Sequence, residues 1–250
     1  MLISCKATKL KYHFYNHLTL LPLQPQKMFK MLFKEITYLV RKELALEIRQ
    51  KYAFGGLLLY VISTVFICYL SFKKIMDPPV YVALFWIIML FAAVNAIAKS
   101  FLSDSRGLQL YYYSIVSPQA VILSKIIYNL FLMLLLALIN LFFYVLFLGN
   151  IIQDMPMFIL SLILGSFGFS SVMSMVSAIA SKANHNVTLM AILSFPVLIP
   201  LIMTIIKFSK NAIDGLDVSV NYQYITVLIA LNVIVIALAY ILFPYLWRNE

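Results

Sequence analysis

The sequence contains little charge and few residues that break helices. Only 11% of its 250 residues are charged, against about 25% in a soluble domain, and 64% are hydrophobic. The mean hydropathy is +0.97. Seven glycines and nine prolines are too few for a collagen-like or low-complexity chain. This composition excludes a soluble enzyme, a disordered chain and a coiled coil, and it predicts a polytopic membrane protein.

Motifs of catalysis and nucleotide binding are also missing. No GxxxxGK[ST] pattern occurs, so the chain does not bind ATP through a P-loop, and HExxH and GxSxG are absent. The two cysteines, Cys5 and Cys68, form no CxxC pair. His13 and His17 stand four residues apart without a third ligand nearby. We therefore predict no enzyme activity, no catalytic residue, no metal ligand and no cofactor bound by this chain.

Six apolar runs are long enough to cross a bilayer as helices, for which about 20 residues suffice. None of them contains Asp or Glu, which disfavours an ion-coupled transporter. The runs predict an all-α membrane protein with spans near residues 53–72, 80–98, 126–148, 155–181, 187–206 and 224–247.

The basic residues indicate the orientation of the spans. With the N-terminus inside, 15 of the 19 Lys and Arg residues fall in cytoplasmic segments, and only Lys73, Lys74, Lys207 and Lys210 fall outside. Basic residues collect on the cytoplasmic side of a membrane protein. We therefore predict that both termini are cytoplasmic, and we assign the net charge of +10 to topology rather than to nucleic acid.

The first thirty residues differ from the remainder of the chain. Residues 1–30 lack the apolar segment and cleavage site of a signal peptide. Met28 and Met31 stand just before a helical pattern. We interpret residues 1–30 as a non-native or disordered extension, and residues 31–250 as one membrane domain.

Residues 31–51 predict an amphipathic helix that lies at the inner membrane surface. At 100° per residue, Glu43 and Glu47 fall on its apolar side, whereas Arg49 lies with the basic residues. Two carboxylates four residues apart repel each other and resist burial in lipid. Either the end of the helix leaves the membrane, or a cationic group of this chain or of a partner meets the two acids.

The cytoplasmic connector at 99–125 mixes charge, one glycine and three consecutive tyrosines. Ser103 or Asp104 is placed to cap a short helix, and Pro118 to open the third span. The connector is either an ordinary amphipathic link or a docking helix for a cytoplasmic partner. In the second case Asp104 and Arg106 supply polar contacts, and Leu108, Leu110 and the tyrosines supply apolar ones.

Small residues and prolines distinguish the fourth and fifth spans. The fourth carries Gly165, Gly168, Ser170 and Ser174, which predicts close helix packing or a dimer contact, with a serine-lined path as the alternative. In the fifth, Pro196 and Pro200 fall on one face and predict a hinge, although structural kinking accounts for them equally well.

Three segments together resemble the CcmB family of cytochrome c maturation. They are KELALEIRQKYA at 42–53, FLSDSRGLQLYYYSIVSPQAVILSK at 101–125 and SFPVLIPLI at 194–202. In the second segment the family pattern is matched by Phe101, Asp104, Gly107, Leu108, Pro118 and Lys125. Gln109 departs from that pattern, and residues 1–30 have no counterpart in it.

The resemblance implies an ABC-2-type permease of the bacterial inner membrane, with a coupling helix between its second and third spans. The implied partners are a cytoplasmic ATPase subunit that binds the ATP, a second copy of the chain, a haem-handling membrane protein, a small membrane subunit and a periplasmic haem chaperone. The implied function is haem delivery or release of the haem-loaded chaperone. The alternatives are a permease for another cargo, such as a lipid-linked glycan or a drug, and a non-transporting scaffold.

Overall fold

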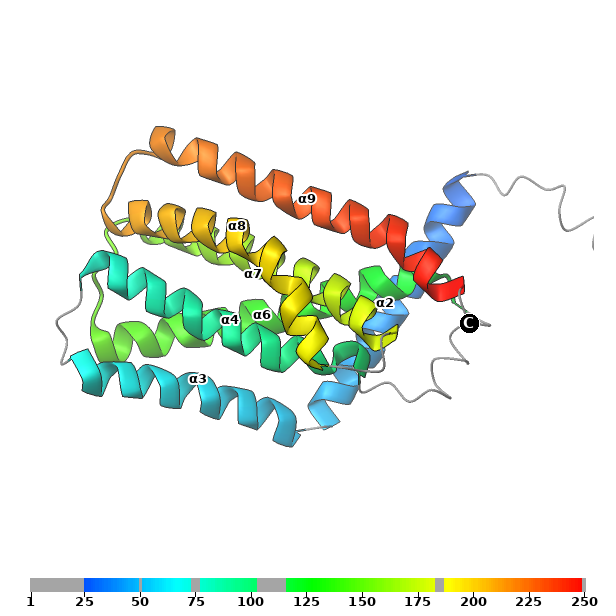
Figure 1. The fold of residues 1–250 in the computed structure, drawn as a ribbon, viewed down its shortest axis with the longest axis horizontal. Coiled ribbons are helices and arrows are strands. Elements are labelled where there is room, and N and C mark those ends of the chain that lie inside the picture. Colours follow the sequence, from blue (N-terminus) through cyan, green and yellow to red (C-terminus); the bar gives the residue numbers. More distant parts are fainter. Residues whose placement is uncertain (1–24, 50, 73–76, 103–115, 183–186, 249–250) are drawn as a thin grey trace, which may run out of the picture.

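The computed structural model describes residues 25–49, 51–72, 77–102, 116–182 and 187–248. Every regular element within these ranges is a helix (Figure 1), and six of the helices are long and apolar enough to cross a membrane. The predicted all-α fold with six spanning helices is therefore confirmed. The helices are α2 (Pro25–Arg49), α3 (Lys51–Phe72), α4 (Pro78–Leu102), α6 (Pro118–Leu148), α7 (Met155–Lys182), α8 (Val187–Ile213) and α9 (Val218–Arg248).

The predicted spans lie inside the observed helices, but three helices are clearly longer. α6 begins at Pro118 rather than at residue 126, α8 continues to Ile213, and α9 begins at Val218. Hydropathy detects only the part of a helix that crosses hydrocarbon, whereas the backbone hydrogen bonds continue into the headgroup region. The prediction therefore missed the polar turns at the helix ends, including the one that carries Lys125.

The N-terminal helix α2 also begins earlier than predicted. It starts at Pro25, inside the segment assigned to an extension, and ends at Arg49. Proline is tolerated in the first turn of a helix, where its missing N–H has no partner in any case. Residues 1–24 lie outside the described part of the chain.

Helix α7 lies at the centre of the bundle. In the apolar 18-residue stretch of α7, 72% of the residues are buried, compared with 17% in the same stretch of α3. It contacts α4, α6, α8 and α9. Its serines and glycines let these neighbours approach closely, since a Cβ atom at Gly165 would overlap the ring of Trp86. Gly168, Ser170 and Ser174 are likewise buried within the chain.

Aromatic and hydroxyl side chains hold α4 against its neighbours. The Trp86 indole donates a hydrogen bond to Ser209 Oγ of α8 over 2.9 Å. The hydroxyl of Tyr144 on α6 donates to the carbonyl of Tyr81 over 3.0 Å. The Phe85 ring packs edge-on against Trp86 and Tyr144. Satisfied polar groups therefore connect α4 to both α6 and α8 inside the bundle.

Two asparagines of α6 are fully buried but differ in their hydrogen bonding. Asn129 Nδ2 donates to Ser174 Oγ of α7 over 2.8 Å. Asn140 has no hydrogen-bond partner among the described residues for either polar side-chain atom. An unpaired buried polar group costs about 1–3 kcal/mol. We therefore expect Asn140 to lower the stability of the folded chain, whereas Asn129 joins two helices.

We expect Asn140→Leu to raise the thermal stability of the purified chain, by an amount corresponding to about 1–3 kcal/mol, because leucine removes an unsatisfied amide of similar shape. Asn129→Leu is the matched control and should lower stability, because it breaks the bond to Ser174. The measurement is the melting temperature in detergent. A fall in stability for Asn140→Leu would show that its amide has a binding partner.

Helix α8 contains both predicted hinge residues. Pro196 and Pro200 lie on its exposed side, and the helix changes direction along its length (Figure 1). Each proline removes a backbone donor and pushes away the carbonyl one turn earlier. Thr204 Oγ1 donates to the carbonyl of Pro200 over 2.7 Å. The two prolines thus bend α8 where it faces away from the bundle.

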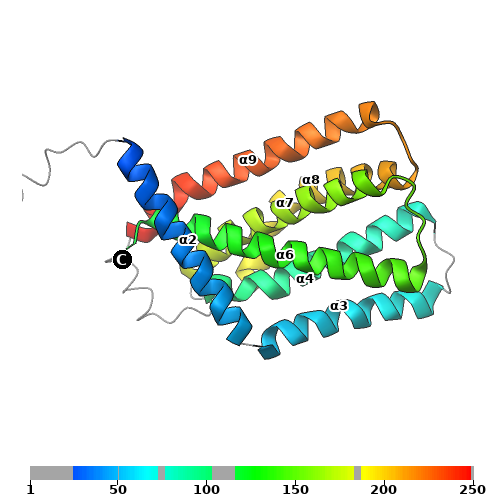
Figure 2. The same cartoon turned by 180° about the vertical axis from the view of Figure 1, so that it is seen from behind.

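Consecutive spans run in opposite directions, so their connectors alternate between the two ends of the bundle. Helix α2 crosses obliquely over the end where α6 begins and α9 finishes (Figure 2). This arrangement places the amphipathic helix against the first turns of α6, which carry both apolar residues and Lys125.

Candidate functional site

An apolar contact holds α2 against the bundle. Ile36 and Leu39 of α2 are buried, and they belong to a small hydrophobic cluster separate from the main core. The other buried members of the cluster come from α6, α7 and α9, namely Ala120, Val121, Ile122, Ile126, Ala178, Ala239 and Phe243. Four helices thus meet at this end of the bundle.

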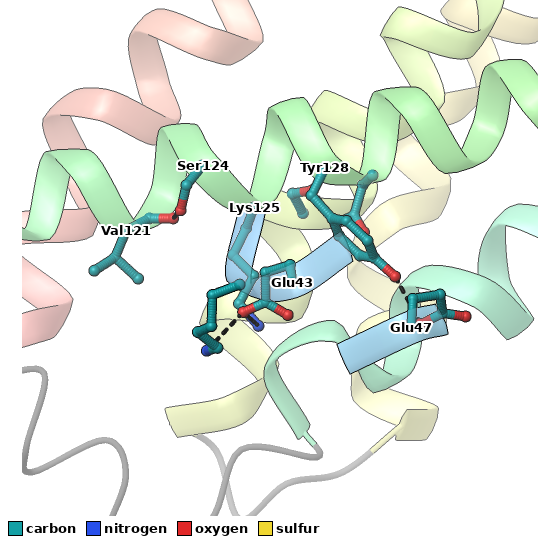
Figure 3. Close-up of polar contacts among 9 residues, drawn as sticks. Glu43, Glu47, Val121, Ser124, Lys125 and Tyr128 are labelled. Atoms are coloured by element: carbon teal, nitrogen blue, oxygen red, sulfur yellow. Dashed lines mark hydrogen bonds and ion pairs between the residues drawn. The ribbon is translucent and has the colours of Figure 1, made fainter. Parts of the chain in front are cut away.

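Glu43 forms the centre of the polar part of the contact. Its Oε1 atom lies 3.2 Å from Lys125 Nζ of α6 and 3.0 Å from Lys42 Nζ (Figure 3). The Lys125 side chain is only 5% exposed and that of Glu43 is 13% exposed. A charge this deeply buried requires a partner, since removing one member of a buried pair is strongly destabilising. The ion pair therefore fixes the position of α2 along α6.

Glu47, one turn further along α2, meets a neutral partner. Its Oε2 atom accepts a hydrogen bond from the Tyr128 hydroxyl over 2.8 Å (Figure 3). The sequence left two interpretations of these acids: the end of the helix leaves the membrane, or a cationic group meets them. For Glu43 the second applies, and Lys42 and Lys125 of this chain supply the cations. For Glu47 the structure places no cation within ion-pair distance among the described residues.

A third carboxylate of α2 makes a contact that sequence analysis missed. Glu35 Oε2 accepts hydrogen bonds from the Ser117 hydroxyl over 2.7 Å and from the Ser117 backbone N–H over 3.3 Å. Ser117 is the N-cap residue of α6, and its own side chain makes no capping bond. Glu35, Glu43 and Glu47 all reach α6, and at 100° per residue their spacings of eight and four residues spread them over about 120° of one side of α2. This spacing was the available signal, but Glu35 looks like an ordinary surface acid when considered alone.

The three carboxylates contact α6 in chain order. Glu35 meets Ser117, Glu43 meets Lys125, and Glu47 meets Tyr128, so polar contacts between the two obliquely crossing helices extend over about three turns. We call this set of three contacts the carboxylate ladder. The ladder begins at Ser117, the residue before Pro118. A movement of the segment that leads into α6 would therefore be passed directly to α2.

The predicted coupling residues fall on both sides of this point. Phe101 lies in the last turn of α4, and Pro118 is the first residue of α6, as its sequence context predicted. Asp104, Arg106, Gly107 and Leu108, and the short helix expected there, lie outside the described residues. Arg49 is exposed at the end of α2.

The other predicted positions do not approach the ladder as a group. Gly165 and Gly168 of α7 pack inside the bundle against Trp86 and Leu201. Pro196 and Pro200 lie on the exposed side of α8. Within the described part of the chain, no three His, Cys, Asp or Glu side chains gather as a metal site would require.

These features define a multi-pass α-helical membrane subunit with an amphipathic N-terminal helix bound to its third span. The chain belongs to the CcmB protein family, whose family model matches residues 34–245. No curated protein matches the chain. The family consists of haem exporter permeases of cytochrome c maturation, so the chain is a membrane permease subunit. Family membership also implies an ABC transporter with an ATPase partner.

Proposed function

We propose that this chain is the membrane subunit of an ATP-driven complex in c-type cytochrome biogenesis, and that its role is mechanical. The carboxylate ladder is the observation that carries this proposal. A cytoplasmic ATPase that binds the segment between α4 and α6 would move the start of α6, and Glu35, Glu43 and Glu47 would transmit that movement to α2. A buried ion pair suits this purpose because it resists slippage between the helices.

The proposed assembly contains two copies of the chain, two copies of the cytoplasmic ATPase subunit, a haem-handling membrane protein, a small membrane subunit and a periplasmic haem chaperone. The complex is placed in the bacterial inner membrane with both termini of this chain in the cytoplasm. The distribution of Lys and Arg among the short connectors supports this orientation. ATP is bound by the partner, since this chain has no P-loop.

Gene deletion tests the proposal and distinguishes two forms of it. c-type cytochromes are scored by haem staining, and the periplasmic chaperone is isolated to determine whether it carries haem. Loss of cytochromes with accumulation of haem-loaded chaperone would assign the complex to chaperone release. Loss of cytochromes with an empty chaperone would assign it to haem delivery. Normal cytochromes would contradict both forms and favour a permease for another cargo.

Substitutions in the segment between α4 and α6 should separate assembly from activity. We expect Gly107→Pro or Asp104→Arg to abolish cytochrome c maturation while the chain still inserts and binds its partners, because each change alters a segment that carries no span. The measurements are haem staining, co-purification of the ATPase and its rate of ATP hydrolysis. Normal cytochrome levels would exclude a coupling role for the segment. If cytochrome c maturation is lost but the rate of ATP hydrolysis by the ATPase is unchanged, the chain would instead be a non-transporting scaffold.

A further inference from the structure

An apolar groove of about 640 Å³ lies between α2, α3 and α6. Pockets that bind one small ligand have volumes of about 300–1,000 Å³. Apart from Glu47 and Tyr128 at one end, its lining consists of glycine and hydrophobic residues: Leu44, Ile48, Phe54, Gly55, Leu58, Phe131, Leu132 and Leu135. Several of these side chains are exposed, including Ile48 at 70% and Phe131 at 55%. The groove is therefore open to the surroundings of the bundle, which in a membrane is lipid.

The lining changes from polar to apolar along α6. Tyr128 stands nearest the start of the helix, and Phe131, Leu132 and Leu135 follow toward its middle. The 31 residues of α6 extend about 46 Å, whereas the hydrocarbon core of a bilayer is about 30 Å thick. The only charged residue of α6, Lys125, stands three residues before Tyr128, and a charged side chain favours the headgroup region, so we place Tyr128 near this boundary. A phospholipid changes from polar to apolar in the same direction, because its headgroup lies at this boundary and its acyl chains lie in the hydrocarbon core.

At the polar end of the groove, the Glu47 carboxylate has no cation within ion-pair distance among the described residues. Glu43 has two ammonium groups within 3.2 Å, whereas among the residues that the structure describes Glu47 receives only the Tyr128 hydroxyl, on Oε2. A carboxylate in a mostly apolar environment is costly without a cation. Charge complementarity at Glu47 therefore favours a ligand with a cationic donor and disfavours an anionic one.

We propose that this groove binds one phospholipid with a primary ammonium headgroup, phosphatidylethanolamine. The ammonium donates to the Glu47 carboxylate, and one acyl chain lies along Phe131, Leu132 and Leu135. Phosphatidylglycerol fits less well because it carries the same phosphate without an ammonium, so nothing in its headgroup compensates the charge of Glu47. The lipid completes the contact between α2 and α6, since its headgroup binds the last carboxylate of the ladder.

Two adjacent glycines provide a matched test of occupancy. A Cβ atom at either Gly55 or Gly56 meets no other atom within 4 Å, but only Gly55 lines the groove. Gly55→Leu should therefore fill the groove without straining the helix, and Gly56→Leu should leave it open. The assembled complex is reconstituted in nanodiscs of equimolar phosphatidylethanolamine and phosphatidylglycerol, and the lipids retained after transfer to detergent are counted by native mass spectrometry.

We expect wild type and Gly56→Leu to retain phosphatidylethanolamine and Gly55→Leu to lose it. Glu47→Gln should still bind lipid but should reduce the preference for phosphatidylethanolamine about fivefold, because a hydrogen bond to a charged acceptor becomes one to a neutral acceptor. The proposal is overturned if both glycine variants retain the same amount, if wild type prefers phosphatidylglycerol, or if Gly55→Leu dissociates the two-copy assembly without changing lipid retention. The assay uses no nucleotide, so its outcome is independent of the proposed coupling to an ATPase.

Discussion

Glu43→Lys should separate α2 from α6 and abolish cytochrome c maturation. The substitution replaces the carboxylate between Lys42 and Lys125 with a third cation, and the Lys125 side chain is only 5% exposed. Breaking a buried ion pair by changing one partner costs about 3–5 kcal/mol, and adding a like charge increases that cost. Melting temperature in detergent and haem staining of cells measure the two effects.

A charge exchange and an exposed control separate the ion pair from general effects of charge. Glu43→Lys combined with Lys125→Glu restores opposite charges across the same contact and should recover most of the stability and activity. Ala45→Lys adds a cation at an exposed position of the same helix and should be nearly neutral. If Glu43→Lys leaves both readouts unchanged, α2 does not depend on this pair. If the double variant is no better than the single one, the partner of Glu43 is not Lys125.

Substitutions of Glu47 should have a different effect from those of Glu43, because the partner of Glu47 is the neutral hydroxyl of Tyr128. The Tyr128 hydroxyl donates to a carboxylate that also lines the groove. Neutralising Glu47 retains an acceptor for Tyr128, whereas neutralising Glu43 leaves a buried ammonium without that carboxylate. Two acids one turn apart are thus expected to differ in their contribution, with Glu43 holding the helices together and Glu47 selecting the lipid.

The predicted fold depended on features that act locally. A run of about 20 apolar residues predicts a spanning helix wherever it packs, and Pro118 predicts a helix start from its fixed φ alone. The polar turns at the beginning of α6 were missed because Lys125 ends an apolar run without ending a helix. Hydropathy therefore located all six spans but placed the start of α6 eight residues late.

The ladder was only partly accessible from sequence, because it depends on how two helices pack. Glu43 and Glu47 were noticed since they interrupt an apolar stripe. Their partners Lys125 and Tyr128 lie about 80 residues away and carry no local signal. Glu35 was overlooked because its partner is an N-cap serine, and an acid near a serine is common on any surface. A search for acids spaced eight and four residues apart along one helix would have grouped all three.

The small residues of α7 also show that sequence alone does not identify the neighbours of a buried residue. Sequence predicted close packing at Gly165 and Gly168, or a contact with a second copy, but could not say which side chains fill the space. In the structure the neighbour of Gly165 is the Trp86 ring, and that of Gly168 is the side chain of Leu201. Trp86 is held by Ser209 and by packing against Phe169, whereas leucine methyl groups can rotate away.

Gly165→Leu should therefore prevent the central helix from packing. Its side chain would enter the space of the buried Trp86 ring, with Ile205 Cδ1 only 3.2 Å from the new Cβ. Overfilling a packed interior costs typically about 1–3 kcal/mol, and we place this substitution at about 3 kcal/mol or more because the rigid Trp86 ring is in the way and both neighbours are buried. The measurements are melting temperature in detergent and the amount of folded chain recovered from membranes.

The two alanine variants provide the graded control. Gly165→Ala should destabilise the chain because even a single methyl group meets the fixed indole, whereas Gly168→Ala should cost less because Leu201 can yield and alanine favours the helix by about 1 kcal/mol over glycine. Equal stability of the two variants would mean that Trp86 moves as freely as Leu201, and that the bond from its indole to Ser209 does not hold it in place. Greater damage from Gly168→Ala would instead locate the tightest approach at the α7–α8 contact.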